Sequence, residues 1–179
     1  MENKIAVIYK SKYGATKQYA GWIALKLGAD LYEVSDIRKN DLKEYDTIIY
    51  GGALYIGKIK GIKFITSNYK KIKDKKISVF MVGMKNFDQN YINLTLENNI
   101  PKEILSNIDT FYFRGKINYK ELSIKDKILM TGLRASISNK DESDISHDDK
   151  MILKVFDNPI DYTDKKTIDI LLNSLFSNS

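Results

Sequence analysis

The sequence contains no cysteine, one histidine and only two prolines among its 179 residues. Without cysteine the chain cannot form disulfides, thiolate nucleophiles, cysteine-ligated zinc sites or iron–sulfur clusters. The single histidine, His147, excludes a metal site with several histidine ligands, and a Ser/His/Asp triad would have to use this residue. We therefore expect no metal centre. A hydrophobic content of 43% with so few prolines argues against disorder, so we expect one folded domain over residues 1–179.

Arginine is also scarce, with 26 lysines but only 3 arginines in the chain. Because proteins that read nucleic acid bases rely on arginine for bidentate contacts, we expect no nucleic-acid partner. The net charge of +6 is unevenly spread: residues 58–76 hold eight lysines and one acid, whereas residues 141–149 hold five acids and no lysine or arginine. The chain outside residues 141–149 therefore carries +11. This charge fits an anionic substrate, an anionic membrane surface or an unselective lysine-rich surface.

Long hydrophobic runs are absent as well. The apolar run Ile5–Tyr9 is too short for a signal peptide. The longest uncharged apolar stretch, Thr47–Gly57, is far below the roughly 18 residues that a membrane-spanning helix needs. We predict a cytoplasmic protein, and the basic charge leaves open peripheral contact with the inner face of the cell membrane.

Short apolar runs alternate with helical patterns along the chain. The patterns predict strands at residues 4–9, 30–34, 46–50, 77–82 and 110–113, and helices at 16–27, 62–72, 101–108 and 163–175. This alternation predicts a doubly wound α/β fold with a parallel sheet. Residues 116–161 are left over after the fifth strand and are predicted to form an insertion.

Three predicted loops lie where ligands bind in such sheets, at the carboxyl ends of the strands. The first, residues 10–16, brings hydroxyl side chains, Gly14 and the start of a helix into one turn. Backbone N–H groups at a helix start carry partial positive charge and suit a phosphate. The alternative is an ordinary polar turn in which Thr16 caps the helix. The loop lacks the G-x-G-x-x-G pattern, so a dinucleotide site is not supported.

The second loop, residues 51–60, contains a misleading motif. Residues 52–59 match G-x-x-x-x-G-K, but Ile59 stands where a P-loop needs a hydroxyl for Mg²⁺. The loop interior, Ala53–Ile56, is apolar and aromatic, which suits one face of a flat ring rather than a triphosphate. A phosphoacceptor receiver domain is excluded too, because Lys10 and Gly51 stand where its acidic residues belong. The third loop, residues 83–90, offers Met84 and Phe87 either as further apolar walls or as core packing.

Taken together, the first and second loops resemble flavodoxin. The phosphate turn of that family reads Ser/Thr-x-Thr-Gly-x-Thr, and residues 11–16 (SKYGAT) match it at the first, fourth and sixth positions, with Tyr13 in place of a hydroxyl residue. Within the superfamily, the runs Tyr9–Ala20 and Gly51–Gly57 are most similar to the menaquinone-dependent protoporphyrinogen IX dehydrogenase group, which also has a long insertion after strand five. The resemblance implies a five-stranded parallel sheet in the order 2-1-3-4-5.

The resemblance also implies non-covalent binding of FMN and singles out no side chain as a catalytic acid or base. The residues implied to hold FMN fall in the three loops: Ser11, Lys12, Tyr13, Gly14, Ala15 and Thr16; Ala53, Leu54, Tyr55, Ile56 and Gly57; Gly83, Met84, Lys85, Asn86 and Phe87. The implied activity is a dehydrogenase that passes electrons from a small substrate to a quinone. The alternatives are an electron-transfer flavodoxin without its own substrate, and a scaffold without flavin. Shuttle flavodoxins are typically acidic, so the basic charge favours the dehydrogenase.

Two segments of the insertion carry their own patterns. Residues 122–140 place Ile124, Ile128, Leu129 and other apolar residues on one side of a helix, with basic residues elsewhere. We favour packing of this helix on the sheet over a basic surface helix that touches a membrane or covers the flavin. The acidic run 141–149 lacks the spacing of a calcium loop and is predicted to be a solvated loop, with His147 exposed rather than catalytic.

Overall fold

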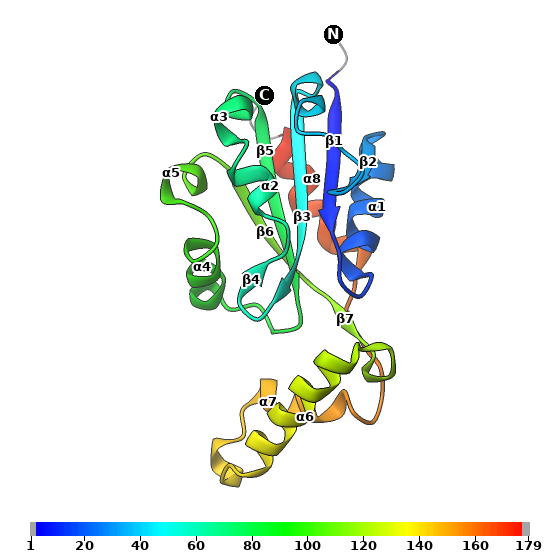
Figure 1. Ribbon diagram of the computed structural model, residues 1–179, viewed down its shortest axis with the longest axis vertical. Helices are drawn as coiled ribbons and strands as arrows, with labels where there is room; N and C mark the ends of the chain where they lie inside the picture. Colours follow the sequence, from blue (N-terminus) through cyan, green and yellow to red (C-terminus); the bar gives the residue numbers. More distant parts are fainter. Residues whose placement is uncertain (1–2, 177–179) are drawn as a thin grey trace.

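A computed structural model describes residues 3–176 and is built around a six-stranded sheet (Figure 1). Five strands run parallel in the order β2-β1-β3-β5-β6: β1 (Ile5–Lys10), β2 (Asp30–Glu33), β3 (Thr47–Tyr55), β5 (Lys76–Gly83) and β6 (Asp109–Arg114). The sixth strand, β4 (Lys58–Ile59), pairs antiparallel with the end of β3. The predicted fold class and strand order are therefore confirmed, because β5 and β6 are the fourth and fifth parallel strands.

Helices cover both faces of the sheet, and alternate residues of each central strand face the two layers. Ala6 and Ile8 of β1 belong to a core cluster that includes residues of the helices α2 (Lys63–Thr66), α3 (Tyr69–Ile72), α4 (Gln89–Glu97) and α5 (Lys102–Leu105). Val7 and Tyr9 belong to the opposite cluster, with α1 (Ala15–Leu27) and α8 (Asp169–Phe176). A strand buried on both faces reads as a continuous apolar run, which is why β1, β3 and β5 were readable from the sequence.

Three predicted helices differ from those in the structure, and at two of them an asparagine side chain competes with the backbone. The helix predicted at residues 62–72 is two short helices, because buried Asn68 lies between them and donates its amide to the carbonyl of Phe64. The helix predicted at 101–108 is shorter in the structure, where α5 ends at Leu105. The Asn107 side chain donates a hydrogen bond to the carbonyl of Glu103. The helix predicted at 163–175 begins as the 3₁₀ helix η4 (Lys165–Ile168).

Helix α4 was not predicted. Its sequence, QNYINLTLE, mixes asparagine with apolar residues, and the helical spacing of Ile92 and Leu96, which are buried, was overlooked. The start signal was present, because Asp88 caps the helix by accepting the N–H of Tyr91 at 2.8 Å. The 83–90 loop is therefore shorter than predicted, since α4 begins at Gln89.

Residues 116–161 form the insertion, which extends away from the carboxyl edge of the sheet (Figure 1). Its stem is the antiparallel pair β7 (Lys116–Ile117) and β8 (Ile160–Asp161). The stem carries α6 (Ile124–Ser138) and α7 (His147–Lys154), with the 3₁₀ helices η2 (Tyr119–Glu121) and η3 (Glu142–Asp144). Helices α6 and α7 pack chiefly on each other, so the prediction that α6 packs on the sheet is wrong. A second correction is that the acidic run forms η3 and the capped first turn of α7, with His147 exposed as expected.

We predict that Gly51→Ala in β3 destabilises the fold. A Cβ at Gly51 would lie 2.1 Å from Cζ of Phe80, whose ring is fully buried. Overpacking of this kind should lower the free energy of unfolding by about 3 kcal/mol, as measured by urea denaturation. The matched control is Gly21→Ala in α1, where nothing lies within 4 Å of the added Cβ, and a gain of up to about 1 kcal/mol is expected there. Equal stability of the two variants would contradict the prediction.

Candidate functional site

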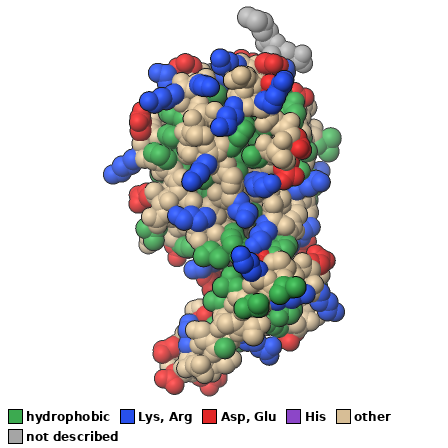
Figure 2. All heavy atoms as spheres, viewed as in Figure 1, with side chains coloured by type: hydrophobic (Ala, Val, Ile, Leu, Met, Phe, Trp, Pro, Cys, Tyr) green, Lys and Arg blue, Asp and Glu red, His purple; other side chains and the backbone are tan. Residues whose placement is uncertain are grey.

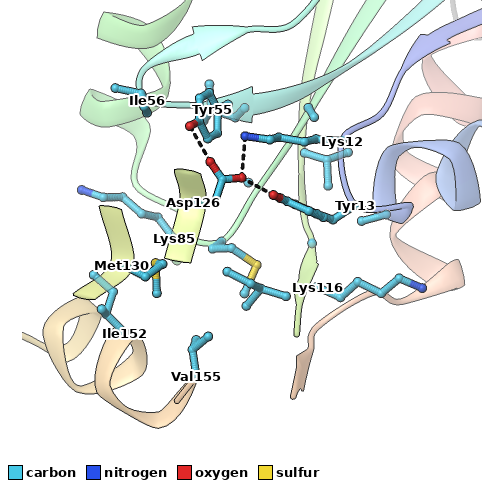
Figure 3. Close-up of a pocket in the computed structure, with 18 of the residues that line it drawn as sticks. Lys12, Tyr13, Tyr55, Ile56, Lys85, Lys116, Asp126, Met130, Ile152 and Val155 are labelled. Atoms are coloured by element: carbon cyan, nitrogen blue, oxygen red, sulfur yellow. Dashed lines mark hydrogen bonds and ion pairs between the residues drawn. The ribbon is translucent and has the colours of Figure 1, made fainter. Parts of the chain in front are cut away.

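A cavity of about 450 Å³ lies between the carboxyl edge of the sheet and the insertion (Figure 3). Cofactor and ligand sites commonly fall between about 300 and 1,000 Å³. All sixteen residues predicted to hold FMN line this cavity except Gly14, Asn86 and Phe87. The topology therefore brings three loops that are far apart in the sequence onto one hollow.

The first loop ends at the N-terminus of α1. Gly14, with a φ of 88°, is the residue before the helix, and its N–H donates to Ser11 Oγ at 3.1 Å. The alternative in which Thr16 caps the helix is therefore wrong, because Thr16 lies buried inside the first turn. Ala15 and Thr16 line the cavity, so the unpaired N–H groups of the first turn lie at its wall. This end of the cavity carries the partial positive charge expected for anion binding.

Lys116 lies beside this end of the cavity, and its ammonium group points away from the hollow toward α1 (Figure 3). It is the first residue of β7, and its Nζ donates to Gln18 Oε1 at 2.6 Å. A Cβ placed on Gly14 would lie 4.0 Å from Cε of Lys116, so the lysine passes directly beside the loop. Lys116 was not predicted as a site residue, because no local motif connects the stem of the insertion with the first loop.

The second loop is an extension of β3 rather than a free loop. Strand β3 continues through Tyr55 and turns at Ile56 and Gly57 into β4, so that Tyr55 is paired with Lys58. Both turn residues have positive φ, 48° and 67°, as a two-residue hairpin turn requires. Glycine adopts this conformation freely, whereas it is strained for a β-branched residue such as Ile56. The Ile56 side chain is held at the cavity rim and is 68% exposed.

The third loop contributes only its first half to the cavity. Gly83, Met84 and Lys85 line it, but Asn86 and Phe87 do not, because the chain turns outward toward Asp88 and the start of α4. Tyr91 of α4 lines the cavity instead, with Lys85 Nζ 4.5 Å from its ring centre. Lys85 also forms an ion pair with Asp148 of α7 at 3.7 Å.

A buried carboxylate joins the first loop, the second loop and the insertion (Figure 3). Asp126 of α6 is 4% exposed and accepts hydrogen bonds from the hydroxyls of Tyr13 and Tyr55, the latter at 2.7 Å. Lys12 Nζ lies 2.6 Å from Asp126 Oδ2 and 3.3 Å from the centre of the Tyr55 ring. Each of the three partners comes from a loop predicted to hold FMN. No local pattern pointed to Asp126, because it lies 113 positions from Tyr13 in the chain.

These contacts set the charge of the cluster. Burial raises the pKa of Asp126, but the hydrogen bonds from Lys12, Tyr13 and Tyr55 outweigh burial and bring the pKa down to about 2. Burial lowers the pKa of Lys12, and its interactions with Asp126 and Tyr55 more than reverse this, so that its pKa is raised. The two side chains therefore form a charged pair at neutral pH. Among residues 3–176, no group of histidine and acidic side chains is placed to hold a metal ion.

The insertion supplies the opposite, apolar wall of the cavity. Its side chains there come from α6, α7 and the residue that follows α7: Leu129, Met130, Leu133, Met151, Ile152 and Val155. The sequence signal for part of this wall was the apolar side of residues 122–140, which was assigned to sheet packing. Leu129 and Leu133 of that side line the cavity, whereas Ile124 and Ile128 are exposed, so only part of the predicted apolar side faces the cavity.

Comparison with known proteins is consistent with this architecture. The sequence profile of the flavodoxin domain matches residues 6–145, which include the sheet, the three loops and α6. A WrbA-like flavodoxin from Agrobacterium tumefaciens is 19% identical, with 70% of this chain and 88% of that chain covered at a TM-score of 0.44. The two-electron reduced flavodoxin of Megasphaera elsdenii is 20% identical, with 62% and 85% covered at a TM-score of 0.44. The Trp repressor binding protein from Bacillus subtilis is 18% identical, with 63% and 83% covered at a TM-score of 0.46. No curated protein matches the chain.

We predict that Asp126 stabilises the protein only above acidic pH. Its folded-state pKa of about 2 lies below the ordinary value of about 3.9, so its contribution is complete above about pH 4 and is lost as the pH falls toward 2. Urea unfolding should show wild type more stable than Asp126→Asn at pH 6, with the difference shrinking below pH 4. The exposed Asp157→Asn variant serves as the control and should match wild type at pH 6. A difference that is constant from pH 6 to pH 2.5 would contradict the assignment.

We also predict that the positive φ of Ile56, at the cavity rim, lowers the free energy of unfolding. Ile56→Asn should raise the free energy of unfolding by about 1 kcal/mol, because asparagine tolerates a positive φ better than isoleucine. The control, Ile170→Asn, replaces an isoleucine of similar exposure in helix α8 and should give no gain. Chemical denaturation of the three proteins measures both effects, and a loss of stability in Ile56→Asn would refute the strain.

Proposed function

The chain belongs to the flavodoxin domain family, and we propose that it binds FMN in the cavity at the carboxyl edge of the sheet. One observation carries this proposal: the loop at the start of α1 and the aromatic loop at the end of β3 open onto the same hollow. The first loop offers what a phosphate needs, and the second offers what a flat ring needs. Neither loop alone distinguishes FMN from another anion or another aromatic ligand.

The residues present fit the two halves of FMN. Lys12, Lys116 and the first turn of α1 would hold the phosphate through charge and N–H donors. Leu54, Tyr55 and Met84 would pack on the ring system. FMN would supply hydride and electron transfer, and the protein would supply orientation and electrostatics. The lysines that line the cavity favour negative charge within it.

The insertion supports a dehydrogenase over a simple electron shuttle. A shuttle needs an accessible flavin edge for its protein partner, whereas α6 and α7 lie over this cavity and line it with apolar side chains. An apolar wall with lysines Lys60 and Lys85 near the rim suits a ring compound with anionic groups and an uncharged quinone acceptor. We therefore propose a flavin-dependent dehydrogenase similar to the protoporphyrinogen IX type, which passes electrons from a small anionic substrate to a quinone.

Membrane contact stays a prediction. Within residues 3–176, no helix combines the length and the apolar character that crossing a bilayer demands. Ile124 and Ile128 on the outer side of α6 are 80% and 68% exposed, and hydrophobic and basic side chains lie together on this part of the insertion (Figure 2). Such a surface suits peripheral contact with anionic lipid.

The first test is whether the purified protein binds FMN, by fluorescence titration. We expect one FMN per chain, and we expect Lys116→Gln to weaken binding about tenfold because a charged contact to the phosphate is lost. Lys26→Gln, an exposed lysine at the far end of α1, should bind as wild type does. If added FMN shows no change in fluorescence on mixing with the protein, the proposed cofactor is wrong.

The second part of the same test separates the enzyme from the shuttle. The FMN-loaded protein is mixed anaerobically with protoporphyrinogen IX and then with a menaquinone analogue, and the flavin absorbance is followed. Bleaching by the first compound and recovery with the second support the dehydrogenase. Bound FMN that responds to neither compound would favour an electron-transfer protein without its own substrate.

A further inference from the structure

Helix α6 is held to the body of the protein by a contact that uses the predicted cofactor residues. The partners of Asp126 are Lys12 and Tyr13 of the first loop and Tyr55 of the second, and all of them lie outside the insertion. A backbone N–H of the insertion, at Ser123, adds a hydrogen bond to the Tyr13 hydroxyl at 3.3 Å. The carboxylate is thus surrounded by an ammonium group and two hydroxyls, which is a donor set that also fits a phosphate.

The other described attachments of the insertion leave α6 able to move. The stem is a two-residue antiparallel pair, β7 with β8. The Lys85–Asp148 ion pair is longer, at 3.7 Å, and its side chains are 50% and 33% exposed, so water weakens it. By contrast, the Lys12–Asp126 pair measures 2.6 Å and its carboxylate side chain is 6% exposed. Release of Asp126 would therefore free the side of α6 that faces the sheet.

We propose that in the free protein the carboxylate of Asp126 engages Lys12 and Tyr13, two donors of the loop that would hold the FMN phosphate, so that FMN binding displaces α6 from the cavity. This inference rests on the proposed function. Two anions a few ångströms apart repel each other strongly in a buried site, so the phosphate and the carboxylate cannot share Lys12 and Tyr13. The phosphate carries close to two negative charges and gains the N-terminus of α1 and Lys116 as well, neither of which bonds Asp126.

The consequence is a built-in competitor for the cofactor. FMN binding requires the Asp126 contacts to break, and this costs free energy. The apparent affinity for FMN is therefore lower than it would be if Lys12 and Tyr13 were free. Once released, α6 and α7 can move together on the stem, because they pack chiefly on each other. The movement would widen the apolar side of the cavity, where a second ring compound has to enter.

The decisive experiment compares FMN with riboflavin, which has the same ring but no phosphate. Asp126→Asn should bind FMN about tenfold more tightly than wild type and riboflavin with unchanged affinity. Asp144→Asn makes the same charge change at the exposed tip of the insertion and should alter neither affinity. Asp126→Ala provides a second variant, and circular dichroism checks that each variant is folded.

The outcomes separate the two proposals. If wild type and Asp126→Asn both bind FMN and Asp126→Asn binds it no more tightly, competition by Asp126 is wrong and the proposed cofactor stands. An equal gain for FMN and riboflavin would also overturn competition, because riboflavin has no phosphate to compete with the carboxylate. If neither protein binds FMN, the proposed cofactor is wrong.

A second experiment measures the position of α6 and α7 directly. Its first comparison, between wild type and Asp126→Asn, is made without cofactor. Because the chain has no cysteine, Ser143→Cys in η3 and Asn93→Cys in α4 can carry two spin labels without background. We expect one inter-label distance in wild type without ligand, and an altered distance in Asp126→Asn without ligand and in wild type with FMN. Inorganic phosphate should shift the wild-type distance in the same direction. An identical distance in all four samples would overturn the displacement of α6.

Discussion

The central strands β1, β3 and β5 are buried on both faces, and this constraint decides where chemistry can occur. A strand covered by helices on each side buries nearly all of its side chains, so a ligand can reach these strands only at their ends. Lys10 to Thr16, Tyr55 to Gly57 and Gly83 to Lys85 all follow such strands. Because the strands are parallel, these segments meet at one edge. The cavity is a direct consequence of that geometry.

The insertion changes what this edge can do. It closes the open side of the hollow with apolar residues of α6 and α7 and places one buried carboxylate, Asp126, among the cations and hydroxyls of the two loops. A carboxylate at this depth persists only because each of its oxygens has a donor. The same three donors make the cluster sensitive to any other anion that enters, so attachment of the insertion and anion binding are coupled by charge.

Much of the fold could be predicted from local patterns. The apolar runs at residues 4–9, 46–50 and 77–82 identified the central strands, and Gly28 ends α1 in a left-handed conformation as its position suggested. Patterns failed where side chains act against the backbone: Asn68 splits one predicted helix, and the polar helix α4 depends on its Asp88 cap and on packing. Thirteen of the sixteen predicted site residues line the cavity, and the three that do not lie beside a helix start or beyond a turn.

Local patterns were enough to predict the strand positions, the loop that suits a phosphate and the loop that suits a ring, because each of these depends on neighbouring residues. That Asp126 and Lys116 belong to the same site as these two loops follows only from the folded arrangement. Their partners are about a hundred residues away in the chain, and the antiparallel stem β7–β8, rather than any local motif, sets the direction in which α6 points. Local propensity cannot carry such information, since it arises from contacts that form only when the chain is folded.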